Sequence, residues 1–366
     1  MDEEQLNKNE ITEDVKPENS EQGYVQTVGE LTLSCETSAR LPLFDNLRGL
    51  LVLGACIVNA LSSVPAAPWY LVHAHSVGAF TVADVGVPFF LFILSVFYTK
   101  NYIKIKETQG KYIAFKKTIQ RGANLVALGT IARFIEKFDG GFASAPFSYF
   151  MMYGCVTVLG LAVVGLKPEI RFGVGMGLLT IQHVLTNTVS FWENSMLVNN
   201  ANEGGLLALI GWLGLLCLFI SFGEMFAAKK KRILALSLPV YLLAILSVVL
   251  YFVVPDSAKL WFDFGKDRLS AFYFMLCYTA ITAVYFVAML TPLKKVCIPV
   301  VSYVGKKPVH FFLAGGVIGY ILYVPFRDLI ADSIWFVIIP VAIMLLLLCG
   351  TAFFVGKYTK KPKAIS

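Results

Sequence analysis

The sequence predicts an all-α polytopic membrane protein with about ten transmembrane helices and with both termini in the cytoplasm. Hydrophobic residues make up 57% of the 366 residues and charged residues only 15%, a composition too apolar for a water-soluble chain of this length. The mean hydropathy of +0.69 agrees with this. Long apolar runs recur along the chain, and basic residues gather between alternate pairs of runs.

Ten apolar runs have about the length that a helix needs to cross a bilayer core of about 30 Å, which is roughly 20 residues. They cover residues 43–64, 80–99, 119–137, 147–166, 170–190, 205–226, 233–254, 270–291, 308–326 and 334–355. The third run is the weakest because Arg133, Glu136 and Lys137 crowd its end. A semi-apolar stretch from Val296 to Val304 precedes the ninth run, and we expect it to be re-entrant or interfacial.

Basic residues predict the orientation of the bundle, because segments rich in Lys and Arg near span ends stay in the cytoplasm. A cytoplasmic N-terminus places most of the 31 basic residues on that side. They lie at Lys100 to Arg121, Lys167 and Arg171, Lys229 to Arg232, Lys294 and Lys295, Lys306 and Lys307, and Lys357 to Lys363. The other side keeps Arg133, Lys137, Lys259, Lys266, Arg268 and Arg327. The loop with His73 and His75 is therefore predicted to face outward.

The two ends of the chain differ from the apolar body in composition. Residues 1–38 hold ten acidic residues against Lys8 and Lys16, which predicts a disordered acidic cytoplasmic tail. It has neither the basic start nor the apolar core of a cleavable signal peptide. Residues 39–356 form the predicted transmembrane domain, and residues 357–366 form a basic cytoplasmic tail.

Several kinds of site are not predicted. The seven cysteines form no CxxC pair and no Cys/His cluster, so we expect no metal site and no disulfide framework. The sequence has no Gly-rich phosphate loop, and no nucleic-acid partner is predicted. Contact with membrane lipids, anionic ones in particular, accounts for most of the basic charge that remains once the acidic tail is set aside.

Three polar side chains of the first run are candidates for a structural or functional role. Asp45 and Arg48 are three residues apart, so they lie on one helical face and can pair near the cytoplasmic surface. Asn59 lies eleven residues beyond Arg48, about 16 Å further along a helix, in the outer half of the membrane. An interfacial ion pair and an interhelical hydrogen bond are the structural alternatives for these residues.

The second run begins with a carboxylate. Asp84 lies about one turn inside the outer end of the run, where an ionised side chain is costly and needs a partner. The preceding loop, YLVHAHSVGAF, supplies two imidazoles, His73 and His75, which could otherwise be ordinary surface residues. We expect one of these histidines to pair with Asp84.

These residues occur in an order that resembles a known family. The pattern is Asp45-x-x-Arg48-Gly49, then Val58-Asn59, then Tyr70-Leu71-x-His73-Ala74, then Thr81-Val82-Ala83-Asp84 followed by Pro88, Phe89, Phe92 and Ile93. It resembles the heparan-alpha-glucosaminide N-acetyltransferase-like family of bacterial-type transmembrane acyltransferases and, more broadly, the acyltransferase-3 group. The resemblance covers residues 41–95 and becomes thin after them.

The resemblance implies an acyltransferase of the cell membrane, in a bacterium the plasma membrane. It would move an acetyl group from cytoplasmic acetyl-CoA, a cosubstrate, to an amine or hydroxyl of an extracytoplasmic sugar or glycan, and relatives suggest a homodimer. By motif position His73 and Asn59 are the catalytic residues and Asp84 is their charged neighbour. A neutral imidazole can take the acceptor proton, the carboxylate can orient that ring, and the amide can donate to the developing oxyanion.

The chain departs from the family pattern in three places. The spacing from His73 to Thr81 is one residue longer, so His75 competes with His73 for the catalytic role. The middle segment YFMMYGCV lacks the family's Gln-Arg pair, and GKKPVHFF has Lys307 where the family has asparagine. Lys306, Lys307 and His310 remain candidates for holding the cofactor on the cytoplasmic side, and Arg268 and Ser270 are candidates for the acceptor side.

Two other classes of function stay open at this point. A solute transporter also uses intramembrane Asp, His and Asn as relay groups, although we find no paired halves with matched broken helices. A non-catalytic membrane scaffold would use the same residues only for packing.

Overall fold

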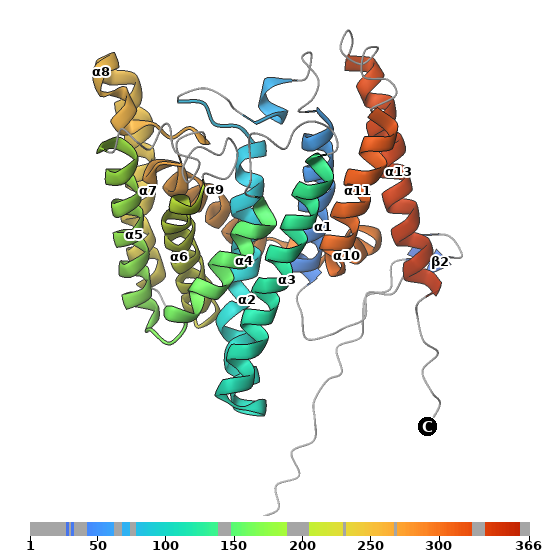
Figure 1. The fold of residues 1–366 in the computed structure, drawn as a ribbon, viewed down its shortest axis with the longest axis horizontal. Helices are drawn as coiled ribbons and strands as arrows, with labels where there is room; N and C mark the ends of the chain where they lie inside the picture. Colours follow the sequence, from blue (N-terminus) through green and yellow to red (C-terminus); the bar gives the residue numbers. More distant parts are fainter. Residues whose placement is uncertain are drawn as a thin grey trace, which may run out of the picture.

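The computed structural model describes residues 27–28, 31–32, 42–61, 68–73, 78–137, 148–188, 205–229, 232–266, 269–323 and 334–358. Apart from two paired two-residue strands, the elements it describes are helices, and the long ones run side by side as a bundle (Figure 1). The helices are α1 Pro42–Leu61, α2 Gly86–Gln109, α3 Lys111–Lys137, α4 Tyr149–Leu159, α5 Pro168–Thr188, α6 Leu209–Ala227, α7 Arg232–Val253, α8 Asp256–Lys259, α9 Ala271–Leu290, α10 Pro299–Lys306, α11 Pro308–Tyr323 and α13 Ile334–Tyr358. Each of the ten predicted runs falls on a helix.

Six of these helices are long and apolar enough to cross a membrane, which supports a multi-pass membrane protein. They are Pro42–Leu61, Ala83–Gln109, Leu209–Ala227, Arg232–Val253, Ala271–Leu290 and Ile338–Gly356. The apolar helices Tyr149–Ala162 and Pro308–Gly319 are shorter, and α3 and α5 are long enough but less apolar. The count of ten spans stays a prediction.

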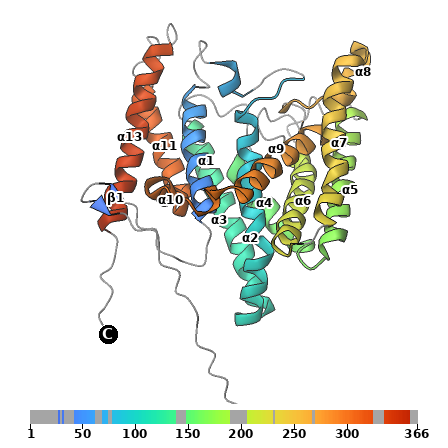
Figure 2. The same cartoon turned by 180° about the vertical axis from the view of Figure 1, so that it is seen from behind.

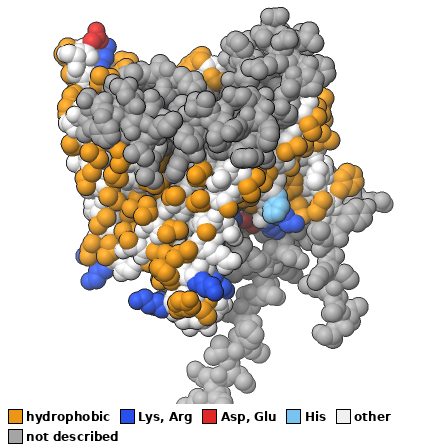
Figure 3. Space-filling view, viewed as in Figure 1, with side chains coloured by type: hydrophobic (Ala, Val, Ile, Leu, Met, Phe, Trp, Pro, Cys, Tyr) orange, Lys and Arg blue, Asp and Glu red, His pale blue; other side chains and the backbone are white. Residues whose placement is uncertain are grey.

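The interior of the bundle is built around α6, whose side chains are mostly buried. Its aromatic rings interlock with those of α2 and α9: the Phe92 ring lies edge-on to Phe219 at 5.1 Å, and Phe219 stacks on Tyr278 at 5.6 Å. Offset and edge-to-face contacts of this kind add about 0.5–1.5 kcal/mol beyond the area they bury. In contrast, apolar side chains cover much of the described surface on the face that Figure 3 shows, as expected for a lipid-facing bundle.

The stretch from Val296 to Val304, predicted to be re-entrant or interfacial, follows a 3-10 turn, Pro292–Lys295, and forms most of the short helix α10. Helix α10 packs closely across α1 because two glycines meet backbone there. A Cβ atom on Gly305 would collide with the carbonyl oxygen of Asp45, and one on Gly49 would collide with the carbonyl oxygen of Val301. Close approach of this kind is the usual role of small residues between membrane helices.

A buried arginine joins α5 to α6. The Arg171 side chain, 1% exposed, donates to the carbonyls of Val163, Val164 and Leu166 at 2.9, 3.0 and 2.7 Å, and to Glu224 Oε1 at 3.0 Å. Three of its bonds therefore go to carbonyls at the end of the preceding helical segment, where carbonyls lack partners within the helix.

The predicted tails lie almost entirely outside the described residues. Within the acidic tail, β1 (Thr27–Val28) and β2 (Leu31–Thr32) pair antiparallel.

Cys297 is disulfide-bonded, whereas Cys56, Cys155, Cys217, Cys277 and Cys349 are free. The expectation of no disulfide framework and of cysteines used for packing rested on spacing alone, and it is wrong for Cys297. Pairing depends instead on Cα atoms that come within about 7 Å in space.

The basic turns predicted to be cytoplasmic share one end of the bundle. The α2–α3, α4–α5 and α6–α7 connections lie at the lower end in Figure 1, where α13 also ends. Seen from behind, the loop before α2 lies at the opposite end (Figure 2). The bundle therefore has one strongly basic end and one end that carries His73.

Candidate active site around His73 and Asp84

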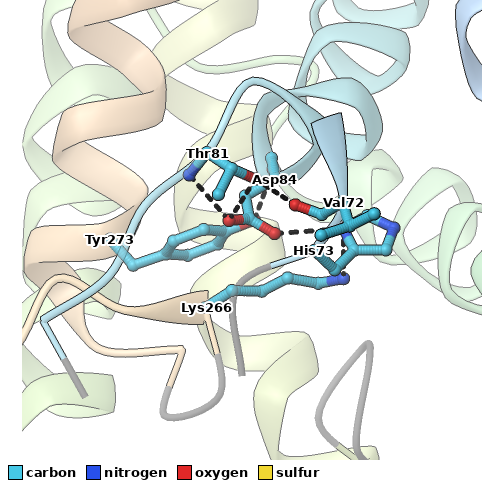
Figure 4. A network of polar contacts seen from close by, with 6 residues as sticks. All are labelled: Val72, His73, Thr81, Asp84, Lys266 and Tyr273. Carbon is cyan, nitrogen blue, oxygen red and sulfur yellow. Dashed lines mark hydrogen bonds and ion pairs between the residues drawn. The ribbon is translucent and has the colours of Figure 1, made fainter. Parts of the chain in front are cut away.

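The segment that leads into α2 fixes the Asp84 carboxylate. Residues Ala83–Val85 form a 3-10 turn directly before α2. Asp84 Oδ2 accepts the Thr81 backbone N–H at 2.9 Å and the Thr81 hydroxyl at 3.0 Å (Figure 4). A carboxylate that reaches back three residues to a backbone N–H is one half of a capping box. The T-x-x-D spacing therefore sets the orientation of this side chain.

The other oxygen of the same carboxylate faces the histidine. Asp84 Oδ1 lies 3.0 Å from His73 Nδ1, and Asp84 is only 1% exposed. The Tyr273 hydroxyl donates to the Asp84 backbone carbonyl at 2.9 Å, which ties the turn to α9. Both carboxylate oxygens thus have partners, as a buried carboxylate requires.

His73 follows the 3-10 turn Trp69–Leu71, and its side chain is 14% exposed. The Thr81 hydroxyl also donates to the Val72 carbonyl at 2.8 Å, so one threonine holds both the histidine's neighbour and its carboxylate partner. In Figure 4 the ring nitrogen Nε2 points away from the network.

A lysine completes the group, although it was not predicted as a site residue. Lys266 Nζ lies 3.2 Å from His73 Nδ1 and 5.9 Å from the centroid of the Tyr149 ring. Lys266 is 3% exposed. We refer to His73, Thr81, Asp84 and Lys266 as the His73 cluster. The signal available in the sequence was a basic residue on the predicted outer side, where few occur.

Asp263 holds the lysine segment against the loop before α2. Its Oδ1 atom accepts the N–H of Gly78 at 2.9 Å and that of Gly265 at 2.7 Å, and the residue is 1% exposed. Gly78 has φ +71°, and a Cβ atom there would collide with the Tyr251 ring. Only glycine therefore fits at position 78 without strain.

The other residues predicted at the outer side have different positions. Asn59 is exposed near the end of α1. Ser270 is buried, donates to the Asp263 carbonyl and accepts the Tyr273 N–H at 3.3 Å, so it caps α9. His75 and Arg268 lie outside the described residues.

The residues predicted at the cytoplasmic side are divided between two places. Arg48 Nη1 lies 3.2 Å from Asp45 Oδ1, so the predicted ion pair is confirmed, and the guanidinium lies 5.5 Å from the Phe97 ring centroid. Lys306, Lys307 and His310 are exposed at the junction of α10 and α11.

A cavity of about 470 Å³ lies near this junction, between α1, α2, α3 and α4. Its polar lining consists of Arg48, Tyr98, Asn101, Tyr102, Thr118, Arg121, Asn124 and Thr157. Its apolar lining comes from Ile93, Leu94, Phe97, Leu125, Leu128 and Val309. Lys306, Lys307 and His310 do not line it. The sequence could not identify this cavity, because its residues come from five separate helices.

No group of His, Cys, Asp and Glu able to hold a metal ion occurs among the residues that the structure describes. What the His73 cluster offers is an imidazole held by a carboxylate, an arrangement suited to general acid–base catalysis. No family model and no curated protein matches the sequence.

Proposed function

We propose that the chain is a membrane-embedded acyltransferase that moves an acetyl group from acetyl-CoA to an amine or hydroxyl of a sugar on the other side of the membrane. The observation that carries this proposal is the 3.0 Å contact between His73 Nδ1 and a buried, doubly anchored Asp84. The resemblance of residues 41–95 to transmembrane acyltransferases supports the same reaction class.

The proposed step uses Nε2 of His73. The acceptor oxygen or nitrogen attacks the thioester carbonyl carbon, and its proton passes to Nε2 as the new C–O or C–N bond forms. The C–S bond then breaks, and the thiolate of CoA takes that proton from the imidazolium. The products are an acetylated sugar and CoA with a free thiol, and His73 returns to its neutral form.

Asp84 has a supporting role in this step. With the Nδ1 proton directed to Asp84 Oδ1, the ring has a fixed orientation and Nε2 carries the lone pair. Asn59 is the proposed oxyanion donor by motif position, and its exposure at the end of α1 leaves its amide accessible to a substrate.

The donor side of the proposal rests on the cavity at the basic end of the bundle. Arg48 and Arg121 are suited to phosphate groups, and the apolar lining of α2 is suited to an uncharged arm. Ile93 of this cavity is nine residues beyond Asp84, about 14 Å further along the chain at helical rise. With the basic end in the cytoplasm, acetyl-CoA would approach from that side and the sugar from the other.

Acetyl-CoA turnover by the purified protein, against a panel of amino sugars and sugar hydroxyls, tests the function. We expect His73→Ala to lower turnover at least about 100-fold, since general acid–base catalysis contributes 10²–10⁴-fold. His310→Ala is the matched control, because His310 is exposed and lies outside the cluster. Unchanged turnover in His73→Ala would refute the assignment of the base.

A transporter is the second candidate, since buried charges near a span also occur in ion and proton pathways. The charges in question are Asp84 and Lys266, 1% and 3% exposed. Proteoliposomes distinguish the two functions. Acetylated product with no net flux of sugar supports the enzyme, whereas flux of unmodified solute that Asp84→Asn abolishes supports the transporter.

A further inference from the structure

The cavity at the basic end of the bundle is elongated along α2 and α3. Its α3 lining extends from Thr118 to Leu128 on one side of that helix, and its α2 lining extends from Ile93 to Tyr102. At 1.5 Å per residue these two stretches are about 15 and 14 Å long. That length is about half of a hydrocarbon core of roughly 30 Å, which is the depth of one leaflet.

The two ends of the cavity differ in polarity. Helices α2 and α3 run in opposite directions from a short connection at the basic end (Figure 1). Both helices line the cavity with polar residues near that connection and with apolar residues deeper in the bundle. The polar residues near the connection are Asn101, Tyr102, Thr118 and Arg121, and the deeper apolar residues are Ile93, Leu94, Leu125 and Leu128. A ligand that matches this lining has a polar head at the basic end and an apolar tail.

The polar end of the cavity carries positive charge. Among the described residues that line it, two are arginines and none is acidic. Arg48 pairs with Asp45, which lies outside the lining. Arg121 is exposed, and a guanidinium group binds phosphate oxygens with two parallel hydrogen bonds. The charge at this end therefore favours an anionic, phosphate-bearing head.

Asn124 indicates that the cavity opens toward lipid. It lines the cavity and lies seven residues, about two helical turns, before Ile131 on the same side of α3. Both side chains are exposed, and Ile131 lies in the apolar part of this helix. Acyl chains offer an amide no hydrogen-bond partner, so an amide on this surface is stabilised by a polar group of the ligand. The phosphate and ester oxygens of a lipid are such groups.

We propose that this cavity binds one anionic phospholipid from the leaflet at the basic end of the bundle. The phosphate group binds Arg121, and one acyl chain packs against Leu94, Leu125 and Leu128. The second acyl chain stays in the bilayer beside α3. The exposed lysines at the α2–α3 connection, Lys106 and Lys111, favour an anionic headgroup over one that carries a cation.

Lipid binding also bears on the proposed acetyl transfer. The same cavity is the proposed donor site, and a volume of about 470 Å³ suits one ligand at a time. A bound lipid therefore competes with acetyl-CoA, and turnover depends on the anionic lipid content of the leaflet. This competition rests on the proposed function, whereas the binding of the lipid does not.

Native mass spectrometry of the full-length protein in detergent tests the binding, with dioleoylphosphatidylglycerol and dioleoylphosphatidylcholine as the probes. We expect the unmodified protein to bind phosphatidylglycerol about fivefold more tightly or better, because basic residues near the membrane surface favour anionic lipid. Arg121→Ala should weaken that binding about tenfold or more, since a hydrogen bond to a charged group is lost. Lys116→Ala is the matched control, because Lys116 is exposed on the same helix and lies outside the lining. It should keep the affinity of the unmodified protein.

A second variant tests the apolar end. Leu128→Trp places a larger side chain where the acyl chain is proposed to lie, so it should weaken the binding of dioleoylphosphatidylglycerol. It should leave the binding of glycerol 1-phosphate, which has no acyl chain, unchanged. Glycerol 1-phosphate that binds as tightly as the lipid would overturn the proposal and indicate a site for free phosphate compounds.

Equal affinity of the unmodified protein for the two lipids would also overturn the proposal, and this criterion needs no substitution. Unchanged binding of phosphatidylglycerol in Arg121→Ala would do the same. Titration of acetyl-CoA against the bound lipid separates this proposal from the proposed function. If acetyl-CoA binds and phosphatidylglycerol does not, the lipid site is refuted and the function stands. If the lipid binds through Arg121 and acetyl-CoA does not displace it, the donor site is refuted and the lipid site stands.

Discussion

Asp263 accepts the backbone N–H of Gly78 at 2.9 Å, across 185 residues of sequence, and thereby joins the loop before α2 to the segment before α9. This bond brings Lys266 to the same place as His73 and Asp84, because the lysine is three residues beyond Asp263. Loss of the bond should therefore separate the charges of the His73 cluster without removing any of them.

Asp263→Ala should lower acyl transfer about tenfold or more, because a backbone N–H bonded to a charged group contributes about 1.5–3 kcal/mol. Steady-state kinetics measure this loss. The exposed Asp256 provides the control, and Asp256→Ala should retain full activity. Equal turnover in the two variants would show that the bond does not position the cluster.

Thr81→Val should reduce turnover about tenfold, because it removes the hydroxyl that donates to Asp84 and to the Val72 carbonyl while it keeps the side-chain volume. The backbone N–H of residue 81 still binds the carboxylate, so the loss stays partial. Thr81→Ser restores the hydroxyl and should recover most of the activity. A serine variant as slow as the valine variant would contradict this account.

Arg121→Ala should raise the KM for acetyl-CoA about tenfold and leave kcat nearly unchanged, because the cavity is proposed to bind the donor and not to take part in the chemistry. Lys307→Ala is the matched control, since Lys307 is exposed outside the cavity lining. Substrate saturation curves give both values. A larger increase in KM in Lys307→Ala than in Arg121→Ala would indicate that acetyl-CoA binds at the α10–α11 junction instead.

Gly305→Ala should destabilise the protein by roughly 1–3 kcal/mol or more, because the new methyl group meets the backbone of α1 at Asp45. Gly54→Ala on α1 is the control, since no atom outside its own helix lies within 4 Å of its added Cβ. Thermal unfolding in detergent measures both. The prediction fails if the two variants unfold at the same temperature.

Arg171→Met should cost about 3 kcal/mol or more of stability, because three carbonyls and Glu224 lose a buried donor together. Arg171→Lys keeps the charge but cannot reach all four acceptors, so it should be intermediate. Unfolding in urea or by heat ranks the three proteins, and an order with Lys at or below Met would argue against this role.

The sequence predicted the helices well because a helix in the membrane is apolar on the side that faces lipid as well as on the side that faces protein. For the same reason it could not predict which face of each helix is inward. Ile281 and Val284 both lie on α9 and are both apolar, yet Ile281 is buried and Val284 is exposed. A run that is apolar all round has no periodicity from which to read this difference.

The candidate site also has a part that the sequence predicts and a part that it does not. The pairing of Asp84 with His73 could be predicted, because the residues are eleven apart and a buried carboxylate needs a partner. Lys266 lies 193 residues from His73, and its place depends on how α7, α9 and the segment between them pack. No spacing in the sequence records that packing, which is also why the cavity at Arg121 was missed.

The amide of Asn46 has a consequence for how the basic end of the molecule moves. Its Nδ2 donates to the Val296 carbonyl at 2.7 Å, and its Oδ1 accepts the Ile298 N–H at 3.2 Å. The Asn46 side chain thus gives the segment that leads into α10 one donor and one acceptor, as the backbone of a neighbouring strand would. A slip of a single residue would break both bonds at once, so the start of α1 and the start of α10 are held in one register and must shift as a single rigid body. Any motion that widens the cavity at Arg48 therefore has to carry α10 with it.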